Sequence, residues 1–347
     1  MKEQEIFKYL KTLAEIFGPV GREEKVQKYL ESQWDSAGIE TKFDKIGNLY
    51  GEIEGEGSHW AIVGHADSIG FLVQQILPSG FLKMAFNTAA TTPDARFLAG
   101  IPLEFLTTND KIAIGYFGLK SGHLAGIEGK KKPVLFDDLF IDLGVESKDE
   151  VIDLGLDIGS PAVFGTPVMQ IGKNVVGKAM DNRVAGTIQT FLGKLLQEKT
   201  NRPKVTLIST VQEELGMKGA AAAAKEFSDY DGVINIDVGL TGDTPSSSDD
   251  YLPTRLGAGP ILVYKDYSIH YSYSLIQKFE KSARKKQISY QKAVFKNYNT
   301  DGMYFFMQGC PTITVAVPCR YTHTNFETVR LIDIRHTLSL LTTFLTS

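Results

Sequence analysis

The 347-residue sequence is poor in cysteine and lacks long hydrophobic runs. Its two cysteines, Cys310 and Cys319, form neither a CxxC pair nor a disulfide framework, which is typical of a reducing compartment. No stretch reaches the roughly 18 apolar residues that a membrane span needs. The amino-terminal segment MKEQEIFKYLKTLAEIFG is charged throughout, unlike a signal peptide. We therefore expect a soluble, cytoplasmic protein with no membrane partner.

A surplus of basic residues is also absent. Lysine and arginine number 37 against 41 aspartates and glutamates, so the formal net charge is -4, and no basic block interrupts the chain. Proteins that neutralise nucleic-acid phosphates carry a basic patch or stripe, so we expect no nucleic-acid partner. The length is sufficient for one large domain or two modest ones, each with a real core.

Helical and strand patterns alternate along most of the chain. Residues 182–199 have helical periodicity, whereas the short apolar runs at residues 204–212 and 231–239 are typical of strands. This alternation predicts an α/β fold class, a three-layer α/β/α sandwich with a mixed, mostly parallel sheet.

Residues 71–160 have a different pattern. Short alternating runs surround an Asn-Asp turn, glycines punctuate the rest, and helical periodicity is scarce. We therefore expect a β-rich insert that divides one α/β domain into a first part, residues 1–70, and a second part, residues 161–347.

Acidic and imidazole side chains follow or interrupt five of the apolar runs. Reactive groups of an open α/β sheet gather beyond the carboxyl ends of its strands, where these side chains are expected. The five stretches are GHADSIG with His65 and Asp67, AMDNRVAG with Asp181, QEELG with Glu213 and Glu214, NIDVG with Asp237, and RYTHT with His323.

Several buried carboxylates at one place require a compensating cation, because an isolated buried charge is very unfavourable. Three carboxylate ligands and two divalent cations leave about one positive charge, which a bridging hydroxide would cancel. Imidazole and carboxylate together suit zinc, with cobalt or manganese as alternatives, rather than calcium. The sequence thus predicts two divalent metal ions per subunit, with zinc favoured.

The HxD motif and the adjacent glutamates suggest separate roles. Asp67 would accept the free imidazole N–H of His65 and fix its tautomer. Glu214 would bind metal, whereas Glu213 would remain free beside the bound water as a general base. Simpler alternatives remain open for these residues: a turn residue at Asp67, an exposed helix-start pair at the glutamates, and a helix N-cap at Asp181.

In this order, the segments GHADSIG, GKAMDNRVAG, VQEELGMKGA, NIDVGLTGDTP and PCRYTHT resemble the motifs of the glutamyl-aminopeptidase family of dinuclear metallopeptidases. This family includes the tetrahedral (TET) aminopeptidases and proteins once labelled cellulase M. The resemblance covers nearly the whole chain. It implies one metal ion on His65, Asp181 and Asp237, a second on Asp181, Glu214 and His323, and a general base at Glu213.

The resemblance also implies that the insert is a PDZ-like β-barrel that mediates dimerisation, and that dimers assemble into a dodecamer. Two departures from the family pattern occur: Ser68 stands where relatives often carry Glu, and THTNFE replaces the commoner HSPxE wording. Neither departure removes a ligand.

The residues and the resemblance together predict a metal-dependent aminopeptidase. It would remove amino-terminal residues from peptides through attack by the bridging hydroxide. One alternative is a glycoside hydrolase, suggested by the paired carboxylates and the old cellulase label, although adjacent glutamates beside histidines fit it poorly. A second alternative is a non-catalytic peptide-binding scaffold that uses the β-rich insert.

Overall fold

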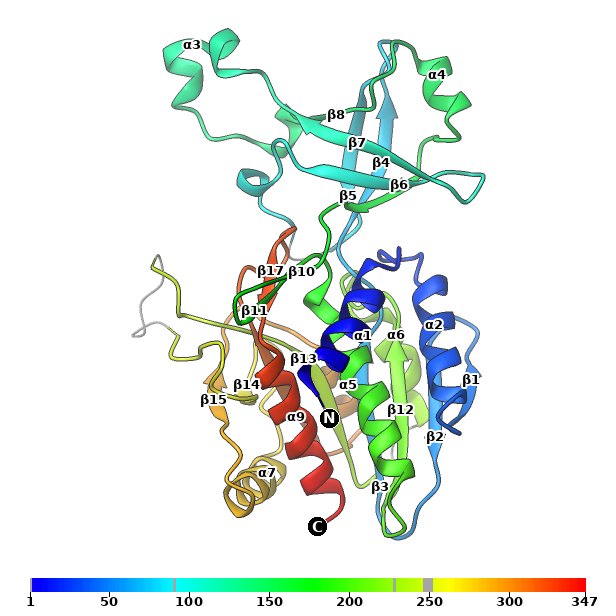
Figure 1. Ribbon diagram of the computed structural model, residues 1–347, viewed down its shortest axis with the longest axis vertical. Coiled ribbons are helices and arrows are strands. Elements are labelled where there is room, and N and C mark those ends of the chain that lie inside the picture. The colour runs from blue at the N-terminus through cyan, green and yellow to red at the C-terminus, as the bar shows by residue number, and fades with distance from the viewer. Residues whose placement is uncertain (1, 90–91, 227–228, 246–251) are drawn as a thin grey trace.

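A computed structural model describes residues 2–89, 92–226, 229–245 and 252–347. Outside the described residues lie 90–91, which belong to the insert, and 227–228 and 246–251, which belong to the part after the insert. An eight-stranded sheet with helices on both faces forms one unit, and a closed barrel stands at one end of it (Figure 1). The α-helices are α1 (Glu3–Glu15), α2 (Glu24–Asp35), α3 (Gly122–Lys130), α4 (Lys148–Asp153), α5 (Met180–Gln197), α6 (Lys218–Ala223), α7 (Tyr273–Lys285), α8 (Gly302–Met307) and α9 (Leu331–Leu345).

The large sheet is mixed, with a parallel centre. Its strands are, in spatial order, β1 (Glu40–Phe43), β2 (Leu49–Ile53), β12 (Lys204–Thr210), β3 (His59–His65), β13 (Gly232–Leu240), β16 (Thr312–Cys319), β14 (Ile261–Lys265) and β15 (Gln291–Val294). The four central strands, β12, β3, β13 and β16, run parallel, whereas β2 and β14 flank them in antiparallel orientation. The predicted fold class is confirmed.

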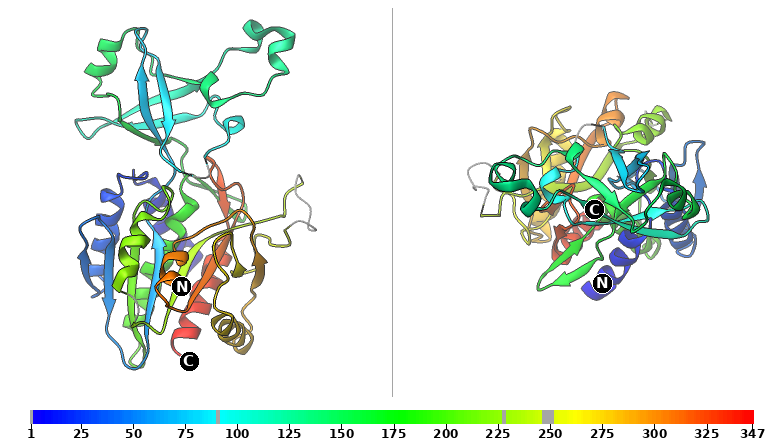
Figure 2. Two further views of the ribbon diagram at one scale, coloured as in Figure 1. Left: turned by 180° about the vertical axis from the view of Figure 1, so that it is seen from behind. Right: turned by 90° about the horizontal axis from the view of Figure 1, so that it is seen from above.

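Burial on both faces explains the near-continuous apolar runs of the central strands. In β13, every residue from Gly232 to Gly239 is buried. One face packs against α1, α2, α5, α7 and α9 in the main core. The small residues of α6 cover the other face, where Ala220 and Ala223 join Val63 and Ile208 in a second cluster beside α8 (Figure 2, left). Among the described residues, no helix combines the length and the apolar character that crossing a membrane would require.

The insert forms a separate closed barrel with its own core. Its strands, in order around the barrel, are β4 (Phe71–Ile76), β5 (Leu82–Phe86), β8 (Phe140–Asp142), β7 (Ile112–Gly118), β6 (Pro102–Leu106) and β9 (Pro161–Phe164). Phe71, Phe105 and Phe117 lie fully or almost fully buried inside it. The chain enters the barrel directly after β3, so the carboxyl end of β3 points toward the barrel (Figure 1).

A small antiparallel sheet lies between the barrel and the large sheet (Figure 1). It contains β10 (Met169–Ile171), β11 (Asn174–Gly177) and β17 (Glu327–Val329). Strand β11 leads into α5, and β17 follows the segment after β16. This sheet therefore joins two segments that approach the carboxyl edge of the large sheet.

A close approach of α5 to β3 depends on Gly64. A Cβ at that position would lie 2.5 Å from Cβ of Ala185, far inside ordinary contact distance. Because no side chain intervenes, α5 packs directly on the end of β3. The amino terminus of α5, with Asp181, consequently lies next to His65.

Candidate metal centre

The predicted site residues converge at the carboxyl edge of the sheet, on the side of the barrel. This is the edge where ligands bind in open α/β folds. His65 is the last residue of β3, Asp181 the second of α5, Glu213 and Glu214 follow β12, Asp237 lies within β13, and His323 follows β16.

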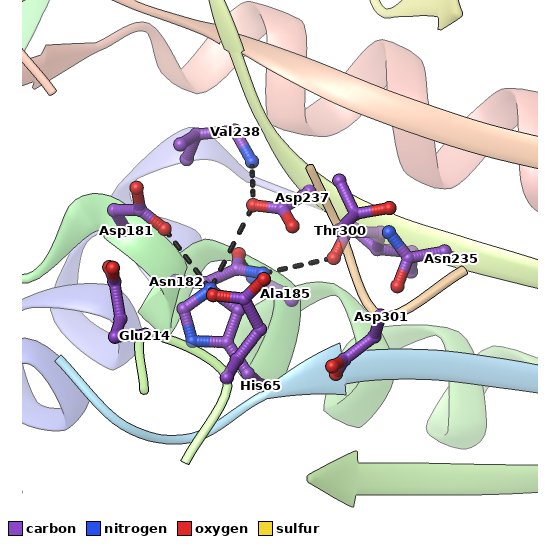
Figure 3. Close-up of polar contacts among 12 residues, drawn as sticks. His65, Asp181, Asn182, Ala185, Glu214, Asn235, Asp237, Val238, Thr300 and Asp301 are labelled. Atoms are coloured by element: carbon purple, nitrogen blue, oxygen red, sulfur yellow. Dashed lines mark hydrogen bonds and ion pairs between the residues drawn. The ribbon is translucent and has the colours of Figure 1, made fainter. Parts of the chain in front are cut away.

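Asp181 lies between the two imidazoles. Its Oδ1 is 3.2 Å from Nε2 of His65, and its Oδ2 is 3.6 Å from Nε2 of His323. On the other side of His65, Oδ1 of Asp237 is 3.9 Å from the same Nε2 (Figure 3). Oε2 of Glu214 is 3.3 Å from Nε2 of His323. Nε2 of each imidazole therefore faces at least two carboxylates, and Asp181 is common to both sets.

The helix N-cap role considered for Asp181 is filled by its neighbour. Oδ1 of Asn182 accepts the backbone N–H of Ala185, and its amide group donates to the carbonyl of Ile236 in β13. Both Asp181 and Asn182 have non-helical dihedral angles. The capping bond of Asn182 leaves both oxygens of Asp181 directed at the imidazoles.

Glu213 and Glu214 lie in a turn rather than on an extended segment. The turn begins after Gln212, whose φ of 54° is uncommon for a residue other than glycine. Both carboxylates reach the site but face different imidazoles: Oε2 of Glu213 is 3.9 Å from Nε2 of His65, whereas Glu214 faces His323. The two glutamates are thus divided between the two halves of the site.

Asp67 contacts the glutamates more closely than the histidine. Its Oδ1 and Oδ2 accept the backbone N–H groups of Glu213 and Glu214, each at 3.0 Å. Nδ1 of His65 is 3.2 Å from the backbone oxygen of Asp67 and 3.6 Å from its carboxylate. The backbone carbonyl of Asp67 is therefore closer to Nδ1 of His65 than the carboxylate that we expected there. The carboxylate of Asp67 instead orders the turn after β12.

The electrostatics of the site show an excess of buried negative charge. Burial raises the pKa values of Glu213 and Asp237 well above the usual range and also raises the pKa of Glu214. Burial opposes the charged form of His65 and His323, yet the surrounding carboxylates raise the pKa of both imidazoles well above the ordinary value. Protonated imidazoles are the cations that the described part of the chain offers inside this cluster.

The nearest buried arginine does not enter the cluster. Arg183 donates to the backbone carbonyls of Leu13 and Gly18. Burial lowers its pKa to about 10, while the charges of Asp67 and Glu23 act in the opposite direction. The charge of Arg183 therefore offsets the charges of Asp67 and Glu23, which belong to none of the candidate ligand groups.

The donor set fits divalent metal ions. Ligand atoms within 4.8 Å of one another form one group from His65, Asp181 and Asp237 and another from Asp181, Glu214 and His323. A further group joins His65 to both glutamates. In the described residues, Oε1 of Glu214 is buried without a hydrogen-bond partner, which is costly unless a cation is nearby.

Two functional side chains were missed in the sequence. Glu327, at the start of β17, accepts the backbone N–H groups of both Asp181 and His323. Tyr298 donates its hydroxyl to the carbonyl of Val238 and lines the cleft. Tyr298 belongs to no spacing pattern with physical meaning. Glu327 is the last residue of the THTNFE segment, four residues after His323, but that pattern indicated no role for it.

A cleft of about 340 Å³ opens above the cluster. The ligands form its floor. Its other lining residues are Gly216, Met217, Leu240, Tyr267, Asn297, Tyr298, Asn299 and Thr322. A volume of this size accommodates one amino-acid side chain and the adjoining peptide bond.

Known proteins are similar to this chain in sequence and in fold. The M42 glutamyl aminopeptidase family model matches residues 47–340. The putative aminopeptidase FrvX of Escherichia coli strain K12 is 30% identical over 347 residues, which cover 97% of this chain and 94% of FrvX. An aminopeptidase from the archaeon Desulfurococcus kamchatkensis has a TM-score of 0.92 at 29% identity, with 99% of this chain and 95% of that chain covered.

A second solved structure is that of the TET1 peptidase of Pyrococcus horikoshii, which can assemble into a tetrahedron or a large octahedral shell. It has a TM-score of 0.88 at 29% identity and covers 99% of both chains. The family predicted from the five motifs is confirmed, and peptide-bond hydrolysis is the activity class that the family supports. By sequence and by fold, this chain belongs to the M42 glutamyl aminopeptidase family.

Proposed function

We propose that the protein is a dinuclear metallo-aminopeptidase that removes amino-terminal residues from peptides. His65, Asp181 and Asp237 would hold one ion, and Asp181, Glu214 and His323 the other. The observation that carries this proposal is the position of Asp181, whose two oxygens face the two imidazoles at 3.2 and 3.6 Å. A carboxylate so placed is suited to bridge two cations.

The mixed imidazole and carboxylate donors favour zinc, with cobalt or manganese as alternatives. Two divalent ions bound there would polarise the carbonyl of the scissile bond and supply a bridging hydroxide as the nucleophile. The buried surroundings exclude bulk water and strengthen every charge interaction within the cluster.

Glu213 is our candidate for the general base. It is not needed in either three-residue ligand group that contains Asp181, yet its carboxylate lies 3.9 Å from Nε2 of His65. Burial raises the pKa of Glu213 well above the usual range in the metal-free protein. Divalent cations beside it would lower that pKa and leave the carboxylate able to accept a proton. It would take that proton from the attacking water and deliver it to the departing amine.

Asp67 is assigned as a positioning residue for this base. Its two hydrogen bonds fix the backbone of Glu213 and Glu214. Bonds from backbone N–H groups to a carboxylate are charge-assisted and stronger than neutral ones. The base and its neighbouring ligand are therefore set in place by a single side chain.

The barrel is proposed to mediate self-association, from dimer to dodecamer. Apolar side chains exposed on it include Ile112, Ile114 and Tyr116 of β7 and Leu124 and Ile127 of α3. One structure of the similar TET1 peptidase contains a dodecamer, and that likeness supports the proposal. Light scattering should then give a particle of twelve 38.3-kDa chains, and a monomer would contradict the proposal.

Chelation tests the proposed function most simply. Exhaustive chelator treatment should abolish hydrolysis of aminoacyl anilides, and added zinc, cobalt or manganese should restore it. A glycoside hydrolase with two acids would need no metal, and a scaffold would show no turnover at all. Activity on an anilide that survives complete removal of metal would refute the proposal.

A further inference from the structure

Glu327 connects the backbones of two residues of one candidate ligand group, Asp181 and His323. Its side chain is almost completely buried. Oε2 accepts the backbone N–H of Asp181 at 3.0 Å, and Oε1 accepts the backbone N–H of His323 at 2.8 Å. These two residues lie 142 positions apart in the sequence, so a single carboxylate fixes two otherwise unrelated segments.

Both segments have backbone conformations that need support. His323 has a φ of 62° and Tyr321 a φ of 60°, in the left-handed region that side-chain-bearing residues rarely adopt. Asp181 departs from helical dihedral angles at the start of α5, where N–H groups have no intrahelical partner. A buried N–H without an acceptor is costly, so the carboxylate of Glu327 stabilises the local conformation at both positions.

We propose that Glu327 is a positioning residue that sets the spacing between Asp181 and His323 and thereby the affinity of the second metal site. The proposal rests on the proposed function, since it concerns the same two ions. Glu327 is not one of the residues whose atoms form the ligand groups, and its hydrogen bonds go to main-chain atoms. It therefore acts through the two ligands that it fixes.

A carboxyl group of this length offers one acceptor oxygen to each of the two N–H groups. A glutamine has one acceptor oxygen, and its amide group would face one N–H with another donor. An aspartate keeps the charge and both acceptors, but its side chain is one methylene shorter. The two variants therefore separate hydrogen-bond geometry from charge: a geometric role predicts that both are impaired, and a purely electrostatic role predicts that aspartate is normal.

The chain offers a matched control in Asp333. It is fully buried at the start of α9, and its carboxylate accepts the backbone N–H groups of Gly257 and Gly259 at 2.7 and 2.8 Å. As at Glu327, one buried carboxylate accepts two backbone N–H groups, but both come from a single loop that carries no proposed ligand. Asp333→Asn should therefore reproduce the loss of stability without the effect on metal.

The experiment uses the full-length holoenzymes of the wild type, Glu327→Gln, Glu327→Asp and Asp333→Asn. Each is equilibrated in buffers of graded free zinc, and bound zinc per subunit is measured by mass spectrometry beside thermal unfolding of the same samples. We expect two zinc ions per wild-type subunit. In both Glu327 variants one of the two should bind about 10- to 100-fold more weakly, the range typical for lost partners of metal ligands.

Asp333→Asn should bind both ions as the wild type does, with a lowered unfolding temperature. Wild-type zinc affinity in folded Glu327→Gln, an equal loss in Asp333→Asn, or normal binding by Glu327→Asp would each overturn the inference. A wild type that binds fewer than two zinc ions would overturn the proposed function itself. The two failures are thus distinguished within one data set.

Discussion

Replacement of Gly64 by alanine should separate α5 from the sheet at the metal centre. The new Cβ would lie 2.5 Å from Cβ of Ala185, and ordinary contact begins near 3.4 Å, so α5 must retreat by about 1 Å. Overpacking of this kind destabilises a protein by about 1–3 kcal/mol. The retreat also shifts Asp181 relative to His65, and a misplacement of ~1 Å can lower the rate by about 10²-fold.

The assay compares kcat/KM for an aminoacyl anilide with thermal unfolding, and Gly193→Ala is the control. Gly193 lies on the same helix, roughly 18 Å from Asp181 at 1.5 Å per residue. Its added Cβ would lie 2.6 Å from Cδ1 of Ile39, the end of a flexible side chain, so a smaller loss of stability is expected, without a loss of activity. Full activity in Gly64→Ala, or an equal loss in Gly193→Ala, would refute the reasoning.

Three further predictions concern the chemistry of the site. Glu213→Gln should lower turnover by about 10²–10⁴-fold with zinc content unchanged, because it removes the proton carrier and no ligand; loss of zinc would contradict the assignment. Zinc binding at pH 7 should release protons and tighten as pH rises, because His65 and His323 have raised pKa values and zinc needs neutral imidazoles. Calorimetry in buffers of different ionisation enthalpy measures this release, and its absence would count against the electrostatics described above. Leucyl and methionyl anilides should be cleaved about tenfold faster than glutamyl or lysyl anilides, because the described residues that line the cleft beside the proposed ligands and Glu213 are uncharged. They are Gly216, Met217, Leu240, Tyr267, Asn297, Tyr298, Asn299 and Thr322. A preference for the glutamyl anilide would exclude that explanation of specificity.

The layered fold could be predicted because each central strand is buried on both faces. That burial requires continuous apolar runs, which the sequence of β13 displays directly. The position of the ligands followed from the same logic, since strand ends such as His65 are the places where buried apolar residues give way to polar ones. The apolar runs therefore placed the candidate side chains at one edge of the sheet, whereas their division into two ligand sets came from the resemblance to the family.

The hydrogen bonds that hold the candidate ligands in position could not be predicted from the sequence in the same way. Asp181 was equally compatible with a helix cap until Asn182 was seen to fill that role. The carboxylate of Asp67 was expected on His65, yet the turn after β12 brings two unpaired N–H groups within its reach. Such contacts depend on backbone conformation, including positive φ angles at residues other than glycine, which no spacing rule encodes.

Glu327 illustrates the limit most clearly. Its partners lie four residues before it and on a different strand-helix junction, 146 residues away. It is the last residue of the THTNFE segment, but neither that segment nor the periodicity of a short strand indicates what its side chain contacts. Only the three-dimensional approach of β17 to the start of α5 shows what it contacts.

The central claim is that Asp181 lies between two metal ions. Anomalous diffraction at the zinc absorption edge, from crystals grown with zinc, tests it most directly. The account predicts two strong peaks in each subunit, one beside His65 and Asp237 and one beside Glu214 and His323, with Asp181 contacting both. A single peak, or peaks away from Asp181, would contradict it.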